Sequence, residues 1–320
     1  MQAVRTLITG VGGQDGGYLA EQLAASQTPS LGLLAPGEAV PSHLMKLQSN
    51  GQIELAACDL ADHAAFRQLL RSVQPDRVFH LAAVSHPPTA ERDPAASRAV
   101  NVTSLEVLLD WMRRDRHDAR LLTVSSAAIF GLPDSQPQDE RTPARPVNEY
   151  GRQKLQVRQL AAEARTAGLF AACAIPFNHE SPRRSEEYVF AKVCRGAARI
   201  SRGMQQQLSV GNLRARRDWG YAPEYATAMS WMLEIERPTE LVLATGEAHS
   251  VEELVAAACA RAGVEVGRRV TSDPTLVRGD DAPELVGNAR RAWEELGWEA
   301  ATRFVDLVAL MVDSALTEPG

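Results

Sequence analysis

The 320-residue chain has only four cysteines, and they are far apart with no Cys-x-x-Cys pair. This scarcity disfavours a disulfide framework or a cysteine zinc site and predicts free thiols in a reducing compartment. The seven histidines are not spaced as metal ligands, so we expect no metal. No apolar run reaches the roughly 18 residues of a membrane span, and no signal peptide is evident. We therefore expect a cytoplasmic protein.

The chain also lacks a strong excess of positive charge. Its formal net charge is -6, which gives no general attraction to nucleic acid or to an anionic membrane, so neither is an expected partner. The hydrophobic fraction of 45% is enough for one large domain or two modest ones.

The first half of the chain alternates short apolar runs with longer amphipathic segments. The expected strands are Val4–Thr9, Ser30–Leu34, Ile53–Ala57, Arg77–Leu81, Leu121–Ser125 and Phe170–Ile175. The expected helices are Gly17–Ala25, Ala64–Val73, Ala96–Arg114 and Glu149–Ala167. This alternation predicts an α/β fold with a doubly wound parallel (Rossmann) sheet.

The pattern changes at Pro176, where loop-forming residues precede a basic helical segment at Tyr188–Gly203. The tail, Ser250–Thr317, is expected to be helical with a short strand near Val264–Val270. We assign 1–175 and 213–249 to a dinucleotide-binding domain. We assign 176–212 and 250–320 to a smaller, interleaved α/β substrate domain over the carboxyl ends of the strands.

A glycine-rich loop, "LITGVGGQDGGYLAEQL", follows the first strand and opens the first helix. Its glycines permit a tight turn and let backbone N–H groups approach a pyrophosphate at the helix N-terminus. The pattern alone also fits an ordinary strand–helix turn, but its place after a strand favours dinucleotide binding. The expected cofactor-binding residues here are Thr9, Gly10, Gly13, Gln14, Asp15 and Gly16.

Two further strand ends support a dinucleotide site. "CDLAD" places Asp59 and Leu60 where an adenine could lie, and the small residues of "HLAAVSH" allow close approach to a cofactor at Leu81, Ala82 and Ala83. The second strand is followed by neither an immediate acid nor an arginine, and Glu38 comes four residues later. The missing arginine favours NAD, with NADP as the alternative.

The chemistry is predicted from Tyr150 and Lys154, which share one face of a helix. A lysine cation and a positive nicotinamide ring would lower the phenol pKa, so that Tyr150 could take a proton from a sugar hydroxyl while hydride leaves. Ser126 at a strand end completes the catalytic set of Ser126, Tyr150 and Lys154.

These motifs resemble the extended short-chain dehydrogenase/reductases that act on nucleotide sugars. Longer strings, among them "TGVGGQDGGYLAEQL", "FNHESPRR" and "GNLRARRDWGYAPEY", resemble the GDP-mannose 4,6-dehydratase family over almost the whole chain. The resemblance implies a GDP-sugar substrate. The implied substrate-binding residues are Ser85, His86, Asn178, Lys192, Arg217, Arg278 and Asp281. Alternatively, Arg183, Arg184, Arg216 and Arg217 form surface ion pairs.

The chain departs from the family at two places. The family has a Glu two positions after the strand-end hydroxyl, which helps to remove the C5 proton and expel the C6 hydroxyl, and here that position is Ala128. The family also has a double arginine for NADP where this chain has Ala35-Pro36. General acid–base help is worth roughly 100- to 10,000-fold, so we expect dehydration to be impaired.

An epimerase does not need this acid, because it oxidises a sugar carbon and returns the hydride to the other face. We therefore favour a GDP-sugar epimerase. The alternatives are a dehydratase with a relocated acid, an NAD(P)H-dependent 4-keto-sugar reductase and, least favoured, a non-catalytic dinucleotide-binding regulator. The resemblance also implies a homodimer that pairs through Ala96–Arg114 and Glu149–Ala167.

Overall fold

The larger lobe is built on one parallel sheet. The computed structural model describes residues 5–277 and 282–318. Within them, seven parallel strands lie in the order β10-β6-β5-β4-β1-β2-β3. Their bounds are β1 (Thr6–Thr9), β2 (Ser30–Leu34), β3 (Glu54–Ala57), β4 (Arg77–His80), β5 (Arg120–Val124), β6 (Phe170–Pro176) and β10 (Glu240–Leu243). The order reverses between β1 and β4, where open α/β sheets bind ligands.

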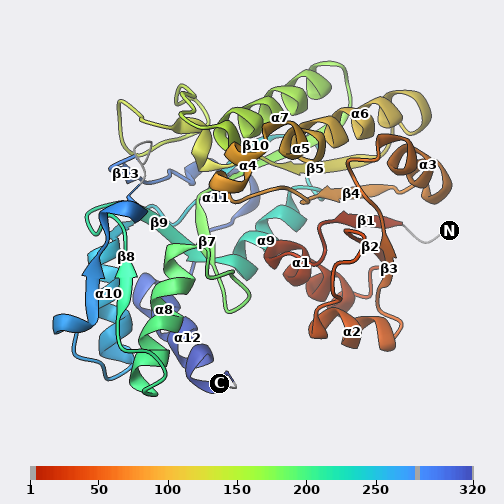
Figure 1. Ribbon diagram of the computed structural model, residues 1–320. Coiled ribbons are helices and arrows are strands. Elements are labelled where there is room, and N and C mark those ends of the chain that lie inside the picture. Colours follow the sequence, from red (N-terminus) through yellow and green to blue (C-terminus); the bar gives the residue numbers. More distant parts are fainter. Residues whose placement is uncertain (1–4, 278–281, 319–320) are drawn as a thin grey trace.

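Helices cover both faces of this sheet (Figure 1). On one face lie α1 (Gln14–Ala25), α2 (Ser42–Ser49) and α9 (Ala222–Trp231), and on the other α3 (His63–Val73), α6 (Ser104–Asp115) and α7 (Glu149–Thr166). Successive strand residues serve opposite faces: Ile8 packs in the core with α1 and α9, whereas Leu7 packs with α3 and α6. Apolar burial on both faces explains why these strands are continuous apolar runs.

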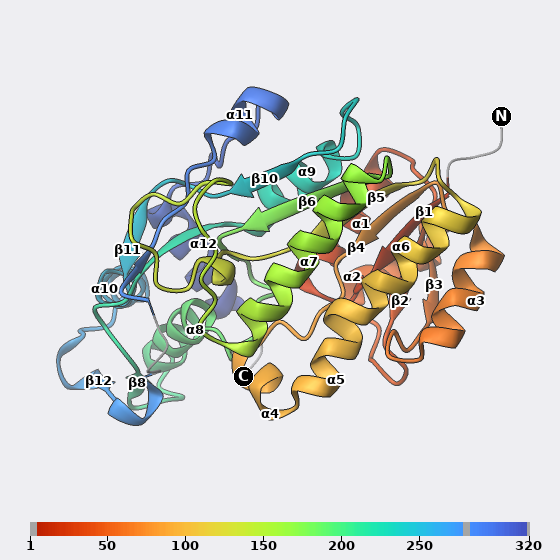
Figure 2. The ribbon, with the colours of Figure 1, turned by 90° about the horizontal axis from the view of Figure 1, so that it is seen from above.

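The smaller lobe lies beyond the carboxyl ends of the parallel strands (Figure 2). Its main sheet contains β7 (Asn178–Glu180), β9 (Arg216–Tyr221), β11 (Ala248–Ser250) and β13 (Glu284–Leu285), and β8 (Leu208–Val210) pairs with β12 (Val270–Ser272). Three helices pack beside them, α8 (Val189–Ser201), α10 (Val251–Arg261) and α12 (Phe304–Thr317). The aromatic rings of Phe190, Trp219 and Phe304 meet in the core of this lobe.

Returning segments join the two lobes. β9 pairs with β7 and β13 in the smaller lobe, while α9 and β10, which follow it, pack in the larger one. Helix α11 (Arg290–Leu296), close to the C-terminus, also packs in the core of the larger lobe through Ala292, as does Trp298 just after the helix. Trp298 donates from Nε1 to the carbonyl of Glu224, 2.9 Å away, which fixes this return.

The structure confirms the predicted strands and helices of the first half with small shifts of their ends, and it corrects two segments. The single helix expected at Ala96–Arg114 is interrupted: α5 (Pro94–Arg98) leads through a π-helical turn, Ala99–Thr103, into α6. A short helix, α4 (Pro87–Arg92), precedes it. The strand expected near Val264–Val270 begins only at Val270, because a 3₁₀ turn at Gly267–Arg269 precedes the pairing with β8.

The four cysteines are buried and none forms a disulfide. Across the described residues, no helix is both long enough and apolar enough to span a bilayer. No group of His, Cys, Asp or Glu side chains in the same part of the chain is placed to hold a metal ion.

Candidate active site

A cavity of about 800 Å³ lies where the carboxyl ends of the parallel strands meet the smaller lobe. Ligand sites commonly have volumes of roughly 300–1,000 Å³. Most of the site residues expected from the sequence line it: Gly10, Gly13, Gln14, Asp15, Gly16, Asp59, Leu60, Leu81, Ala82, Ala83, Ser85, His86, Ser126, Tyr150, Lys154, Asn178, Lys192 and Arg217. Arg278 and Asp281 lie outside the described residues.

Thr9 stands behind the cavity wall instead of lining it. Its buried hydroxyl accepts a hydrogen bond from the backbone N–H of Ala82 at 3.2 Å and lies 3.0 Å from Nδ1 of His80. Burial lowers the pKa of His80 to about 3, so its imidazole stays neutral. Thr9 therefore ties the end of β1 to the end of β4, on either side of the point where the strand order reverses.

The glycine loop fits a dinucleotide pyrophosphate. Gly10 has φ +70°, and a Cβ there would lie 2.7 Å from the backbone of Ala82. A Cβ on Gly16 would lie 2.3 Å from the carbonyl oxygen of Gly10. Gly13 begins α1 without a side-chain cap, so backbone N–H groups of the first turn remain available to an anion. A cradle that only glycine can form, at a helix N-terminus on the cavity, matches this class of cofactor.

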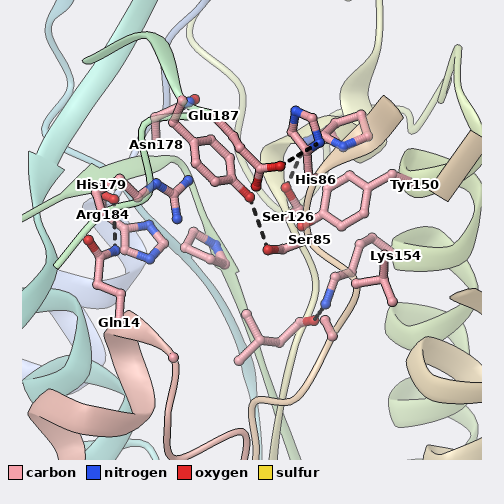
Figure 3. A pocket seen from close by; sticks show the side chains of 18 of the residues that line it. Gln14, Ser85, His86, Ser126, Tyr150, Lys154, Asn178, His179, Arg184 and Glu187 are labelled. Carbon is pink, nitrogen blue, oxygen red and sulfur yellow. Dashed lines mark hydrogen bonds and ion pairs between the residues drawn. The ribbon is translucent and has the colours of Figure 1, made fainter. Parts of the chain in front are cut away.

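Ser126 and Tyr150 come from two elements that are locked together. Ser126 caps the 3₁₀ turn Ala127–Phe130, where its Oγ accepts from the N–H of Ala128 at 3.2 Å. Tyr150 stands in the first turn of α7, and the hydroxyl of Ser125 donates to the carbonyl of Lys154 in the next turn, 2.9 Å away. The start of α7 is thus held against the end of β5, and Figure 3 shows Ser126 beside Tyr150.

Lys154 is anchored to the end of β5, with its ammonium near the Tyr150 ring. Its ammonium donates to the carbonyl of Val124 at 2.8 Å and lies 5.8 Å from the centre of the Tyr150 ring. Burial raises the pKa of Tyr150 to about 12 and lowers that of Lys154 to about 8. In the protein alone the phenol pKa is therefore raised, because desolvation outweighs the hydrogen bond with Ser126 and the charge of Arg184.

A buried ion pair joins the cofactor loop to the smaller lobe. Nε2 of His179 lies 3.0 Å from both carboxylate oxygens of Asp15, and Nδ1 lies 2.8 Å from the carbonyl of Phe177. Gln14 donates to the carbonyl of His179 at 3.1 Å and accepts from Ser181 at 2.8 Å. Both ring nitrogens face acceptors, which is the arrangement of a doubly protonated imidazolium. The contacts fix β7 to the N-terminus of α1.

Tyr188 is a cavity residue that the sequence analysis missed. Its hydroxyl lies 3.0 Å from that of Ser85 (Figure 3), and the guanidinium of Arg184 stacks 3.4 Å from the centre of its ring. The ring also meets the edge of His86, with 5.9 Å between centres. No sequence signal marks Tyr188 as a cavity residue, because it begins an expected helix and its partner, Ser85, lies 103 positions earlier in the chain.

Asn101 is a second missed residue, and it explains the π-helical turn. Its side chain accepts from the N–H of Val84 at 2.7 Å and donates to the carbonyl of Val84 at 3.2 Å and to Gln153 at 2.8 Å. The wide turn directs the amide toward the loop after β4. It thereby connects this cavity loop with α7.

The basic residues divide into two groups. Arg183 and Arg216 form partly exposed ion pairs with Glu21 and Glu284, which fits the surface ion pairs considered from the sequence. Arg184 instead pairs with the buried Glu180 and lines the cavity. Arg217 lines the cavity as well, and its guanidinium donates to the carbonyls of Arg216 and Ala282. Lys192 on α8 and Asn178 on β7 line the same side.

Ala128, two positions after Ser126, presents only a methyl group to the cavity. Two glutamates, Glu140 and Glu149, do not replace the missing acid. Glu140 accepts from the N–H of Val242 at 2.7 Å, and Glu149 pairs with Arg152 at 3.0 Å, outside the cavity lining. One acid on the cavity, Glu187, lies 3.9 Å from Nδ1 of His86.

A doubly wound sheet with a glycine-cradled helix terminus and a Ser–Tyr–Lys set on one cavity defines an extended short-chain dehydrogenase/reductase. Comparison with known proteins narrows this class. The family model for GDP-mannose 4,6 dehydratase matches residues 7–311, and the chain belongs to this family of nucleotide-sugar-modifying enzymes.

Individual relatives agree with this placement. GDP-mannose 4,6 dehydratase 2 of Arabidopsis thaliana is 35% identical, over 97% of this chain and 86% of the relative. Among solved structures, a putative epimerase from Burkholderia cenocepacia matches with a TM-score of 0.84 and 28% identity, over 99% of both chains. The UDP-glucose 4-epimerase of Thermus thermophilus in complex with NAD matches with a TM-score of 0.82 and 25% identity, over 98% of this chain and 99% of that one.

Gly16→Ala should damage the cofactor cradle. The added Cβ would meet backbone atoms of Gly10 and Val11, which cannot move aside as a side chain can. We expect the free energy of unfolding to fall by about 1–3 kcal/mol and dinucleotide affinity to fall with it. Gly13→Ala is the control, because its Cβ would meet only the Gly10 oxygen at 3.3 Å. Denaturant titration measures the free energy of unfolding of each variant. Equal losses of this free energy in the two variants would contradict this account.

The Asp15–His179 pair should make stability depend on pH. Burial alone would lower the pKa of His179, but the Asp15 carboxylate raises it above 6.5; burial alone would raise that of Asp15, but His179 lowers it below 3.8. The pair therefore stabilises fully between these values, and its contribution is lost as pH rises through the raised histidine pKa. We expect His179→Gln to cost more unfolding free energy near pH 5.5 than near pH 9, measured by denaturant titration. Equal costs at both pH values would refute the pair's role.

Proposed function

We propose that the chain is an NAD(P)-dependent GDP-sugar epimerase that works through a transient keto-sugar. The observation that carries the proposal is that Ser126, Tyr150 and Lys154 share the cavity while a methyl group stands at Ala128. Groups for moving a proton on and off a sugar hydroxyl are present. The acid expected for loss of water is absent from that position.

Each residue of the set has a distinct role in this proposal. Ser126 hydrogen-bonds the sugar hydroxyl that is to be oxidised, and Tyr150 takes its proton as the carbonyl forms. Lys154, held by Val124, keeps a positive charge beside the phenol. A bound oxidised nicotinamide accepts the hydride and adds a positive charge, which favours the phenolate. Return of hydride to the other face, with the proton from Tyr150, inverts the carbon and leaves no net redox change.

A second candidate is a dehydratase with a relocated acid. It is favoured by one observation, the pairing of Glu187 with His86 on the wall that also carries Ser85 and Tyr188. A carboxylate and an imidazole that share a cavity with Ser126 and Tyr150 could transfer the protons of an elimination. Glu187→Gln tests this candidate, since it removes the acid and keeps the shape.

The assembly state and compartment remain predictions. We propose a cytoplasmic homodimer through α6 and α7, as the family resemblance implies. The outward residues of α7 would then form a polar contact, because they are Arg152, Gln156, Gln159 and Glu163.

The reaction type can be tested in deuterated water without added cofactor. GDP-mannose and related GDP-sugars are incubated with the purified protein, and products are analysed by mass spectrometry and NMR. We expect an isomer of unchanged mass that carries no solvent deuterium, because the hydride that leaves returns to the same carbon. The Arabidopsis thaliana relative is the positive control for dehydration.

Other products would separate the alternatives. A 4-keto-6-deoxy sugar with solvent deuterium would refute the epimerase, and its loss in Glu187→Gln would establish the second candidate. Turnover that requires added NAD(P)H and a keto-sugar would identify a reductase.

Tyr150→Phe should abolish turnover but leave dinucleotide binding intact. Loss of the proton-transferring hydroxyl is expected to lower kcat by roughly 100- to 10,000-fold, with dinucleotide binding retained. Tyr188→Phe is the matched control, because it also removes a cavity hydroxyl, the one beside Ser85; we expect it to raise KM more than it lowers kcat. Steady-state kinetics measures both. Parental activity in Tyr150→Phe would contradict the role of Tyr150, whereas a parent that binds dinucleotide but turns over none of the GDP-sugars would support the non-catalytic regulator.

A further inference from the structure

The turn after β2 carries a carboxylate back to the cavity. Gly37 has φ +79°, and the N–H of Glu38 donates to the carbonyl of Ala35 at 3.0 Å. The side chain of Glu38 then folds back, so that its Oε2 accepts from the N–H of Ala35 at 2.9 Å. An acid that stands four positions beyond the strand is thereby held at the strand end itself.

This carboxylate lies directly against the glycine loop. A Cβ on Gly12 would fall 2.1 Å from Oε1 of Glu38, so the two segments touch only because residue 12 has no side chain. Glu38 lines the cavity together with Leu34 and Ala35. In doubly wound folds, this position after the second strand faces the ribose of the adenosine half of a dinucleotide.

The charges at this end of the cavity have one sign. Glu38 and Asp59 both line this end. Among the described residues, the neighbours of these two acids on the cavity wall carry no charge: Gly10, Gly13, Leu33, Leu34, Ala35, Cys58 and Leu60. The cationic residues that line the cavity, Lys154, Arg184, Lys192 and Arg217, come from α7 and the smaller lobe. A second phosphate group at the adenosine end would therefore meet carboxylates.

We propose that Glu38 is the residue that selects NAD over NADP in this chain. Its free carboxylate oxygen accepts a hydrogen bond from the 2′-hydroxyl of the adenosine ribose, a charge-assisted bond of the stronger kind. The 2′-phosphate of NADP carries close to two negative charges at neutral pH and is repelled by the same group. The inference rests on the dinucleotide site alone and holds whichever reaction the enzyme catalyses.

Equilibrium binding tests this without turnover. The purified protein, stripped of endogenous nucleotide, is titrated with NAD⁺ and NADP⁺ by isothermal calorimetry at two ionic strengths. We expect NAD⁺ to bind about tenfold to 100-fold more tightly, and this ratio to shrink in high salt because the repulsion is screened. Glu38→Gln, which removes the charge but keeps the shape, should bring the two affinities within a few-fold of each other, and Glu38→Arg should reverse the preference.

The control is Glu54→Gln, an exposed glutamate on the neighbouring strand β3 that does not line the cavity. Its NAD⁺ to NADP⁺ affinity ratio should equal that of the parent. Equal affinities in the parent protein, or a ratio that Glu38→Gln leaves unchanged, would overturn the proposal. Failure to bind either dinucleotide would refute the cofactor site itself, and inactive protein that still prefers NAD⁺ would refute only the proposed reaction.

Discussion

The ion pair between Asp15 and His179 is the contact on which the site depends. Asp15 belongs to α1, the helix behind the glycine loop, and His179 belongs to β7, the first strand of the smaller lobe. Burying two charges is costly unless each is paired and hydrogen-bonded. Here the carbonyl of Phe177 accepts from His179, and Gln14 donates to the Asp15 carboxylate at 3.3 Å, which meets that condition. Because the pair fixes β7 against α1, it also fixes the distance between the cavity wall proposed for a dinucleotide and the wall proposed for a sugar.

Much of the architecture could be predicted from sequence, because the signals were local. The alternation of apolar runs and amphipathic segments depends on which faces of each element are buried, and it located the parallel strands. The spacing of Tyr150 and Lys154 follows from helical geometry, and the glycine loop requires only its flanking strand and helix. Each of these patterns is contained in a short, continuous segment of the sequence.

Features that join distant segments could not be predicted. The hydroxyl contact between Ser85 and Tyr188 and the amide of Asn101 on Val84 depend on how separate elements pack. The contact of Glu38 with Ala35 is local, but it depends on the positive φ of Gly37, which the sequence does not show. The burial that raises the pKa of Tyr150 in the protein alone could not be predicted either, since a sequence shows a neighbouring lysine but not the desolvation of the phenol.

The central claim is that this site oxidises a sugar carbon and stops short of elimination. Its most direct test uses GDP-mannose with deuterium at sugar C4 and follows the label by NMR. An epimerase takes the label as hydride and returns it to the same carbon, so we expect deuterium at C4 of a sugar with inverted configuration. In 4,6-dehydration C4 is oxidised and C6 reduced, so deuterium at C6 of a 6-deoxy product would contradict the account.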